Sequence, residues 1–151
     1  GFKPLVDGRA ISVAHPDLAT SGGIIETKRI ADYCRDAGIG VALHQAGSPV
    51  VAMANAHSAM AMENFIALEM HSVDNPWWND IVDLVGQEGD VIQNGYVNVT
   101  DAPGLGLEIN EEAVAENLAK ASETRAGVYP AGVFEDSSEW DELDAHDRVW
   151  S

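Results

Sequence analysis

The sequence predicts an α/β fold in which parallel strands alternate with helices. Short runs that are apolar on both faces recur at residues 10–15, 39–44 and 64–70, which is typical of parallel strands buried on both sides. Segments with apolar residues at helical spacing lie between these runs. Hairpin signals are missing from this half of the chain. Together these observations indicate repeated βα units with helices covering a parallel sheet.

The elements of the first half follow one another in a regular cycle. The run "AISVAH" predicts the first strand, and "PDLATSGG" predicts a loop after it. Apolar residues at helical spacing with charges between them predict a helix over 23–37. The cycle then repeats as the strand "IGVALH" (39–44), the small-residue helix "VVAMANAHSAMAM" (50–62) and the strand "NFIALEM" (64–70). Three parallel strands cannot close a barrel, so we expect this chain to be the C-terminal part of something larger.

The pattern changes beyond residue 72. The segment "DNPWWND" predicts a loop, "GYVNV" a short strand and "DAPGLGLEI" a turn. Asn110 is expected to cap the helix "EEAVAENLAKA", whose first acidic residues favour the positive end of the helix dipole. The acidic, irregular residues 127–151 carry Trp140 and Trp150, which we expect to anchor this segment on another surface.

Composition excludes several classes of protein. The formal net charge of −17 repels phosphate backbones, so nucleic acid is not an expected partner. Acidic residues are spread along the whole chain, which favours a salt-loving source, because concentrated salt screens their repulsion. The single cysteine excludes an internal disulfide framework. No apolar run approaches the ~20 residues of a membrane span, and we expect a cytoplasmic location.

An ionisable side chain follows or ends each of the three strands. Asp17 follows the first strand, His44 ends the second and Glu69 lies at the end of the third, at separations of 27 and 25 residues. Each separation is close to the ~30 residues of a βα repeat, so the three side chains recur at equivalent places. Sites in α/β folds are built at the C-terminal ends of strands. This recurrence makes the three residues candidates for one catalytic site.

Each of these residues taken alone also has a structural interpretation. Asp17 follows a proline, where aspartate is common in turns, and His44 alone is typical of a histidine packed at a strand end. Glu69 stands in apolar company, where a carboxylate needs a partner. Asp17 and His44 on adjacent strands could hydrogen-bond, and the carboxylate would then fix the imidazole tautomer and raise its basicity. Such a pair is a candidate general base.

The two segments "HPDLATSGGIIETKRIADYCRDAGIGVALHQAGSPV" and "NFIALEM" resemble the mandelate racemase branch of the enolase superfamily. The resemblance extends from about residue 9 to residue 120 and includes "PGLGLEIN". It is strongest for sugar-acid dehydratases of the galactonate and gluconate type. It implies strands six to eight of a modified (β/α) TIM-type barrel in residues 1–95. Residues 96–151 would then return towards an N-terminal capping domain that is not part of this sequence.

The resemblance also implies roles. Asp17 and His44 would be the base dyad acting at the α-carbon, and Glu69 would hydrogen-bond the enediolate from a buried carboxyl that is neutral at least in the transition state. It implies a Mg²⁺ ion whose ligands lie on earlier strands, outside this chain, so that the chain alone would be inactive. The expected partners are a small sugar acid and further copies of the chain in a homo-oligomer. A racemase or cycloisomerase of the same superfamily, and a non-catalytic fragment, are the alternatives.

Four further residues are candidates for roles near this site. Gln45 could reach a sugar hydroxyl or cap its own loop, His71 could line the site mouth or cap the third strand, and Trp77 could wall the pocket or pack on a neighbouring surface. His15 could point to the same side as Asp17, and with His44 it would give a rival interpretation as a metal-dependent hydrolase site. Gln45, His71 and Trp77 are the candidate substrate-binding residues.

Overall fold

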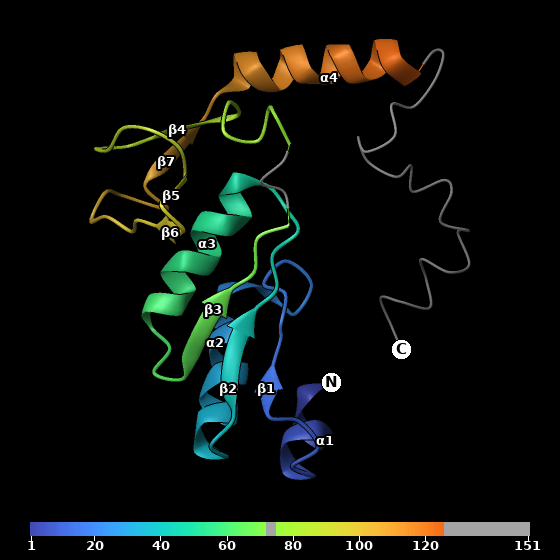
Figure 1. The fold of residues 1–151 in the computed structure, drawn as a ribbon, viewed down its shortest axis with the longest axis vertical. Helices are drawn as coiled ribbons and strands as arrows, with labels where there is room; N and C mark the ends of the chain where they lie inside the picture. The colour runs from blue at the N-terminus through green and yellow to red at the C-terminus, as the bar shows by residue number, and fades with distance from the viewer. Residues whose placement is uncertain (72–74, 126–151) are drawn as a thin grey trace. The chain divides into compact units, whose positions relative to one another are not determined.

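A computed structural model describes residues 1–71 and 75–125 of the chain, with the side chains of 121–125 left undescribed. Its contacts divide the chain into two units, 1–110 and 111–151. The first unit contains three parallel strands, β1 (Val13–Ala14), β2 (Gly40–Leu43) and β3 (Phe65–Leu68), in that spatial order. The crossover helices are α2 (Gly23–Asp36) and α3 (Pro49–Met60). The predicted α/β class and βα cycle are therefore confirmed (Figure 1).

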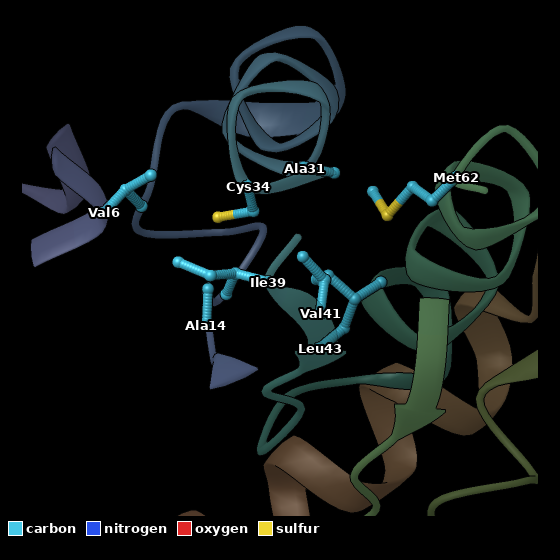
Figure 2. Close-up of a cluster of buried hydrophobic side chains, with 8 residues drawn as sticks. All are labelled: Val6, Ala14, Ala31, Cys34, Ile39, Val41, Leu43 and Met62. Atoms are coloured by element: carbon cyan, nitrogen blue, oxygen red, sulfur yellow. The ribbon is translucent and has the colours of Figure 1, made fainter. Parts of the chain in front are cut away.

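The two crossover helices lie on the same face of the sheet. Helix α2 packs against β2, α3 packs against β3, and the helices contact each other (Figure 1). An additional helix, α1 (Phe2–Asp7), precedes β1 and packs on α2; it was not predicted. Between sheet and helices lies a core to which strands, helices and loops all contribute (Figure 2): Val6, Ala14, Ala31, Cys34, Ile39, Val41, Leu43 and Met62.

Side chains alternate between this core and the opposite face of the sheet. Val41 and Leu43 are buried in the core, whereas Gly40 and Ala42, which alternate with them, lie on the other face and are only partly buried. The register of β2 and β3 shifts between Val41 and Ala42, which leaves Ile66 as an extra residue in β3. On β3, Phe65 stays 37% exposed and Ile66 59% exposed. Apolar parallel strands are normally covered on both faces, so this face of the sheet has room for further packing.

Glycines form the turn that leads from β1 into α2. Gly22 and Gly23 have φ angles of 108° and 79°, in the left-handed region that favours glycine. A Cβ atom on Gly22 would also lie 2.9 Å from the Cβ of Glu26. The tight turn therefore accounts for both glycines, and it directs the chain from the end of β1 back along the sheet.

Residues 75–110 add two small antiparallel ladders to the first unit. Strand β4 (Val82–Leu84) pairs with β7 (Leu107–Ile109), and β5 (Ile92–Gln93) forms a hairpin with β6 (Tyr96–Val97). The turn of the hairpin is Asn94–Gly95, with φ angles of 53° and 82°, typical of a two-residue hairpin loop. The predicted strand "GYVNV" is thus half of a hairpin. The predicted boundary between residues 95 and 96 falls inside this hairpin and stays a prediction.

The buried Trp78 ties these ladders to the βα units. Its ring packs with Ala52 of α3, Val82 and Val91, and its Nε1–H donates to the backbone oxygen of Gly47 at 2.9 Å. Gly47 belongs to the loop between β2 and α3. The same tryptophan therefore holds the loop that follows His44 in place.

The second unit contains helix α4 (Glu111–Arg125), which includes the predicted helix and extends beyond it. Its first turn carries Glu111 and Glu112, as favoured by the helix dipole. Asn117 donates to the backbone oxygen of Ala113 at 2.8 Å. The acidic segment 127–151 with Trp140 and Trp150 lies outside the described residues. Among the described residues, no helix combines the length and the apolar character that a membrane crossing requires.

Candidate active site

The ladder of the sheet continues past the strand ends and sets the spacing of Asp17, His44 and Glu69. Asp17 and His44 form an isolated parallel bridge, and the N–H of His44 donates to the oxygen of Pro16 at 3.0 Å. The N–H of Glu69 donates to the oxygen of Leu43 at 2.9 Å. The ends of three parallel strands therefore bring these residues together at one edge of the sheet, as the recurrence in the sequence predicted.

Asp17 and His44 are joined by a short hydrogen bond. Nδ1 of His44 lies 2.6 Å from Oδ2 of Asp17, and Oδ1 of Asp17 accepts the N–H of Thr20 at 3.0 Å. Burial raises the pKa of Asp17, but the bond from His44 and the backbone N–H groups of Thr20 and Ala19 outweigh it, so this pKa is lowered. The ionised carboxylate can only accept. His44 therefore donates through Nδ1 and presents the lone pair of Nε2.

Glu69 places one carboxylate oxygen between two imidazole rings. Its Oε2 lies 3.2 Å from Nε2 of His15 and 3.5 Å from Nε2 of His44. The side chain is 38% exposed. Burial raises its pKa, but the backbone N–H of Gln45 and the charges of His44 and His15 outweigh burial, so the pKa of Glu69 is lowered. The expected buried setting is wrong, because Glu69 is half-buried. The carboxyl is ionised at rest and is partnered by two imidazole rings, and its neutral form in the transition state stays a prediction.

His15 belongs to this cluster, although its place in the sequence indicated only a rival metal site. Its Nδ1 lies 2.8 Å from the backbone oxygen of Ala42 in β2. Its ring stands edge-on to that of His44, with centroids 5.4 Å apart and planes at 90°. The signal in the sequence was the spacing of His15 and Asp17, which puts both on one side of the strand. The missing information was the position of Glu69, which comes from 54 residues further along the chain.

The described residues do not fit a resident metal ion. Within residues 1–71 and 75–125, no group of three or more histidine, cysteine, aspartate or glutamate side chains could hold one. In the cluster around His44, the carboxylates face ring nitrogens and backbone N–H groups rather than a shared point. The rival interpretation as a metal-dependent hydrolase site therefore has no support in these residues.

The three predicted substrate-binding residues have different surroundings. Gln45 is fully buried; its Nε2 donates to the backbone oxygens of Gly47 and Ser48, and its Oε1 accepts the N–H of Gly47. These bonds use both N–H groups of the amide and one acceptor site of its oxygen, so Gln45 caps its own loop, and its role in substrate binding stays a prediction. His71 is exposed and Trp77 is partly buried. Their roles stay predictions.

Comparisons with known proteins show the family to which the chain belongs. The family described as "Enolase C-terminal domain-like" matches residues 1–113. A D-xylonate dehydratase from Haloferax volcanii is 40% identical over 118 residues, which cover 78% of this chain and 28% of that protein.

Solved structures give the same result. A mandelate racemase/muconate lactonizing enzyme-like protein from Rubrobacter xylanophilus matches with a TM-score of 0.73 and 43% identity, over 76% of this chain and 28% of its own. An enolase from Pantoea ananatis, solved with bound D-gluconate and Mg, matches with a TM-score of 0.63 and 33% identity, over 76% of this chain and 27% of its own. The chain thus spans little more than a quarter of the length of these relatives.

Proposed function

Because the chain belongs to the enolase C-terminal domain-like family, we propose that the full-length protein dehydrates a sugar acid. The substrate would be an aldonate such as xylonate, gluconate or galactonate, and the product a 2-keto-3-deoxy acid. The observation that carries the proposal is the Asp17–His44 hydrogen bond of 2.6 Å beside Glu69 at the adjacent strand end. A D-xylonate dehydratase among the relatives supports the same reaction class.

In this proposal His44 removes the proton from the carbon next to the substrate carboxylate. Nε2 carries the lone pair because Nδ1 donates to Asp17. The carboxylate of Asp17 holds the ring in this tautomer and stabilises the imidazolium that forms. The electron pair of the broken C–H bond becomes the double bond of an enediolate. The hydroxyl on the neighbouring carbon then leaves with its electron pair and takes up a proton from an acid elsewhere in the full-length protein to become water. The enol product tautomerises to the 2-keto acid, and His44 releases the proton it removed to solvent.

Glu69 would lie beside the oxygen on which negative charge develops. An ionised carboxylate repels an oxyanion, whereas a protonated carboxyl donates a hydrogen bond to it. Glu69 is ionised in the structure, and its Oε2 lies 3.2 Å from a ring nitrogen of His15 that can carry a proton. Glu69 can therefore become a donor only if a proton reaches it as the intermediate forms.

We also propose that the reaction depends on Mg²⁺. The support comes from the Pantoea ananatis enolase, which has D-gluconate and Mg bound. The described residues of this chain do not fit a metal site, so the ligands would come from elsewhere in the full-length protein. What the metal supplies when bound is positive charge at the enediolate oxygens.

The test is to incubate the full-length protein with Mg²⁺ in high salt against D-xylonate, D-gluconate, D-galactonate and other aldonic acids. We expect a 2-keto-3-deoxy acid from at least one of them and none after chelation of the metal. Exchange of the α-proton in deuterated water without any keto product would instead support a racemase. If no acid gives either a keto product or exchange of its α-proton, catalysis by this site is refuted.

A further inference from the structure

The protonation state of His15 follows from its two neighbours. Its Nδ1 lies 2.8 Å from the backbone oxygen of Ala42, and a carbonyl oxygen can only accept. Nδ1 therefore carries a hydrogen and donates it. In the neutral ring this leaves Nε2 without a hydrogen, facing Oε2 of Glu69 at 3.2 Å. A lone pair opposite a carboxylate oxygen is repulsive, so a proton must lie between His15 and Glu69.

His44 faces the same oxygen, Oε2 of Glu69, and its neutral ring also carries its hydrogen on Nδ1. Its Nδ1–H donates to Asp17, so its Nε2 also points a lone pair towards Oε2 of Glu69, at 3.5 Å. One carboxylate oxygen thus faces two ring nitrogens that compete for one proton. If the proton sits on His44, the base is blocked. If it is shared by His15 and Glu69, Nε2 of His44 is free to act.

We propose that His15 is a positioning residue that holds a proton on its Nε2, shared with the carboxylate of Glu69, and so keeps Nε2 of His44 unprotonated and basic. Without His15, the ring nitrogen left beside the Glu69 carboxylate would be that of His44, and the carboxylate would stabilise the imidazolium there. The same shared proton is available to Glu69 when negative charge develops on the substrate. It then passes from Nε2 of His15 to Oε2 of Glu69, breaking an N–H bond and forming an O–H bond, and it returns when the product leaves.

The charged and titratable groups around Nε2 of His44 come from all three strand ends. His15 and Asp17 follow β1, and Glu69 follows β3, with the exposed His71 two residues further on. Asp17 contacts the opposite nitrogen of the ring, so its effect on His44 is the same with or without His15. Replacement of His15 therefore isolates the contribution of the shared proton.

The experiment compares wild type with His15→Gln in the full-length protein. Glutamine keeps an N–H donor but cannot carry a mobile proton. The pH dependence of kcat/KM with D-xylonate is measured with Mg²⁺ present, and the titration of His44 is followed by NMR on histidine-labelled protein without substrate. We expect the acid limb of the profile and the midpoint of the His44 titration both to rise by about one pH unit, as for loss of a positive neighbour beside a carboxylate.

The matched control is His57→Gln. His57 contacts the backbone oxygen of Leu105, away from this cluster, so its replacement should leave both measurements unchanged. A His15→Gln variant with native unfolding temperature and unshifted profiles would overturn the inference. The inference rests on the proposed function only for its kinetic readout: if no aldonic acid reacts, the proposed function fails, and the His44 titration still decides the role of His15.

A measurement on the wild type alone decides the matter if the variant does not fold. The nitrogen chemical shifts of a neutral imidazole distinguish hydrogen on Nδ1 from hydrogen on Nε2. We expect both His15 and His44 to carry theirs on Nδ1. Hydrogen on Nε2 of neutral His15 would contradict the geometry on which the shared proton depends.

Discussion

Nδ1 of His44 and Oδ2 of Asp17 lie 2.6 Å apart, although 27 residues separate them in the chain. The bridge between Asp17 and His44 extends the parallel ladder of β1 and β2 past the strand ends and sets the distance between the two residues. A rigid sheet edge therefore holds this pair, with a short loop on either side.

Replacement of Asp17 by asparagine should destabilise the protein in a pH-dependent way. The pKa of Asp17 is lowered in the folded state, so the ionised form favours folding. This contribution is full above the pKa of the unfolded chain, near 4, and is lost as the pH falls through the lower folded value. We expect Asp17→Asn to cost about 2 kcal/mol at pH 6 and clearly less at pH 3. Denaturant unfolding at both pH values measures this, and an equal cost at both would contradict it.

Gln45→Leu should lower stability and leave substrate binding nearly unchanged. The substitution removes the amide that satisfies Gly47 and Ser48, at a cost of about 1–3 kcal/mol for buried groups left without partners. Thermal unfolding and KM are measured together. A large rise in KM at native stability would return Gln45 to the substrate-binding residues.

Asn55→Leu should be neutral or stabilising. Asn55 on α3 is fully buried, and neither atom of its amide has a hydrogen-bond partner among the described residues. An apolar side chain of similar size removes the cost of that desolvated amide, which is about 1–3 kcal/mol. Comparison of the free energies of unfolding of the variant and the wild type tests this prediction. A loss of more than about 1 kcal/mol would mean that the amide is satisfied by a buried water.

Stability should increase with salt. The net charge is −17, and ionic strength shortens the range of repulsion between exposed acids, to about 3 Å at 1 M. We expect the unfolding temperature to rise between 0.1 and 2 M KCl, and to rise less in a variant whose exposed Asp83 and Glu108 are both replaced by lysine. A flat response would argue against the salt-loving source that the composition favours.

The sequence predicted the βα cycle because strands apolar on both faces, with helical segments between them, are typical of a parallel sheet covered by helices. It also predicted that Asp17, His44 and Glu69 lie close together, because equivalent positions in successive βα repeats lie at the same edge of a sheet. His15 was missed as a partner of Glu69, since an alternation pattern gives the face of a side chain but not its neighbour two strands away. The prediction that Glu69 is buried was wrong for a related reason. "FIALEM" is apolar, yet Phe65 and Ile66 remain exposed in this chain, so apolar neighbours did not imply burial.

The loop after His44 shows a second limit of the sequence. Gln45 at a strand end is equally suited to bind a sugar or to cap a turn, and only the positions of Gly47 and Ser48 decide between them. The dipeptide Asn94–Gly95 is typical of a hairpin turn, but β5, which pairs with β6 in this hairpin, is too short to show the alternation of a strand. A homo-oligomer stays a prediction from the resemblance.

The measurement that tests the account most directly is turnover of D-xylonate, D-gluconate and D-galactonate by full-length His44→Asn beside the wild type, with Mg²⁺. We expect kcat for the sugar acid that the wild type dehydrates to fall by at least about 10³-fold, since a general base of this kind contributes about 10²–10⁴. The unfolding temperature should fall by no more than Asp17→Asn lowers it, because the half-buried ring fills no part of the core and the main loss is its hydrogen bond to Asp17. Strong unfolding of the variant together with residual dehydration would contradict the account and make His44 a structural residue.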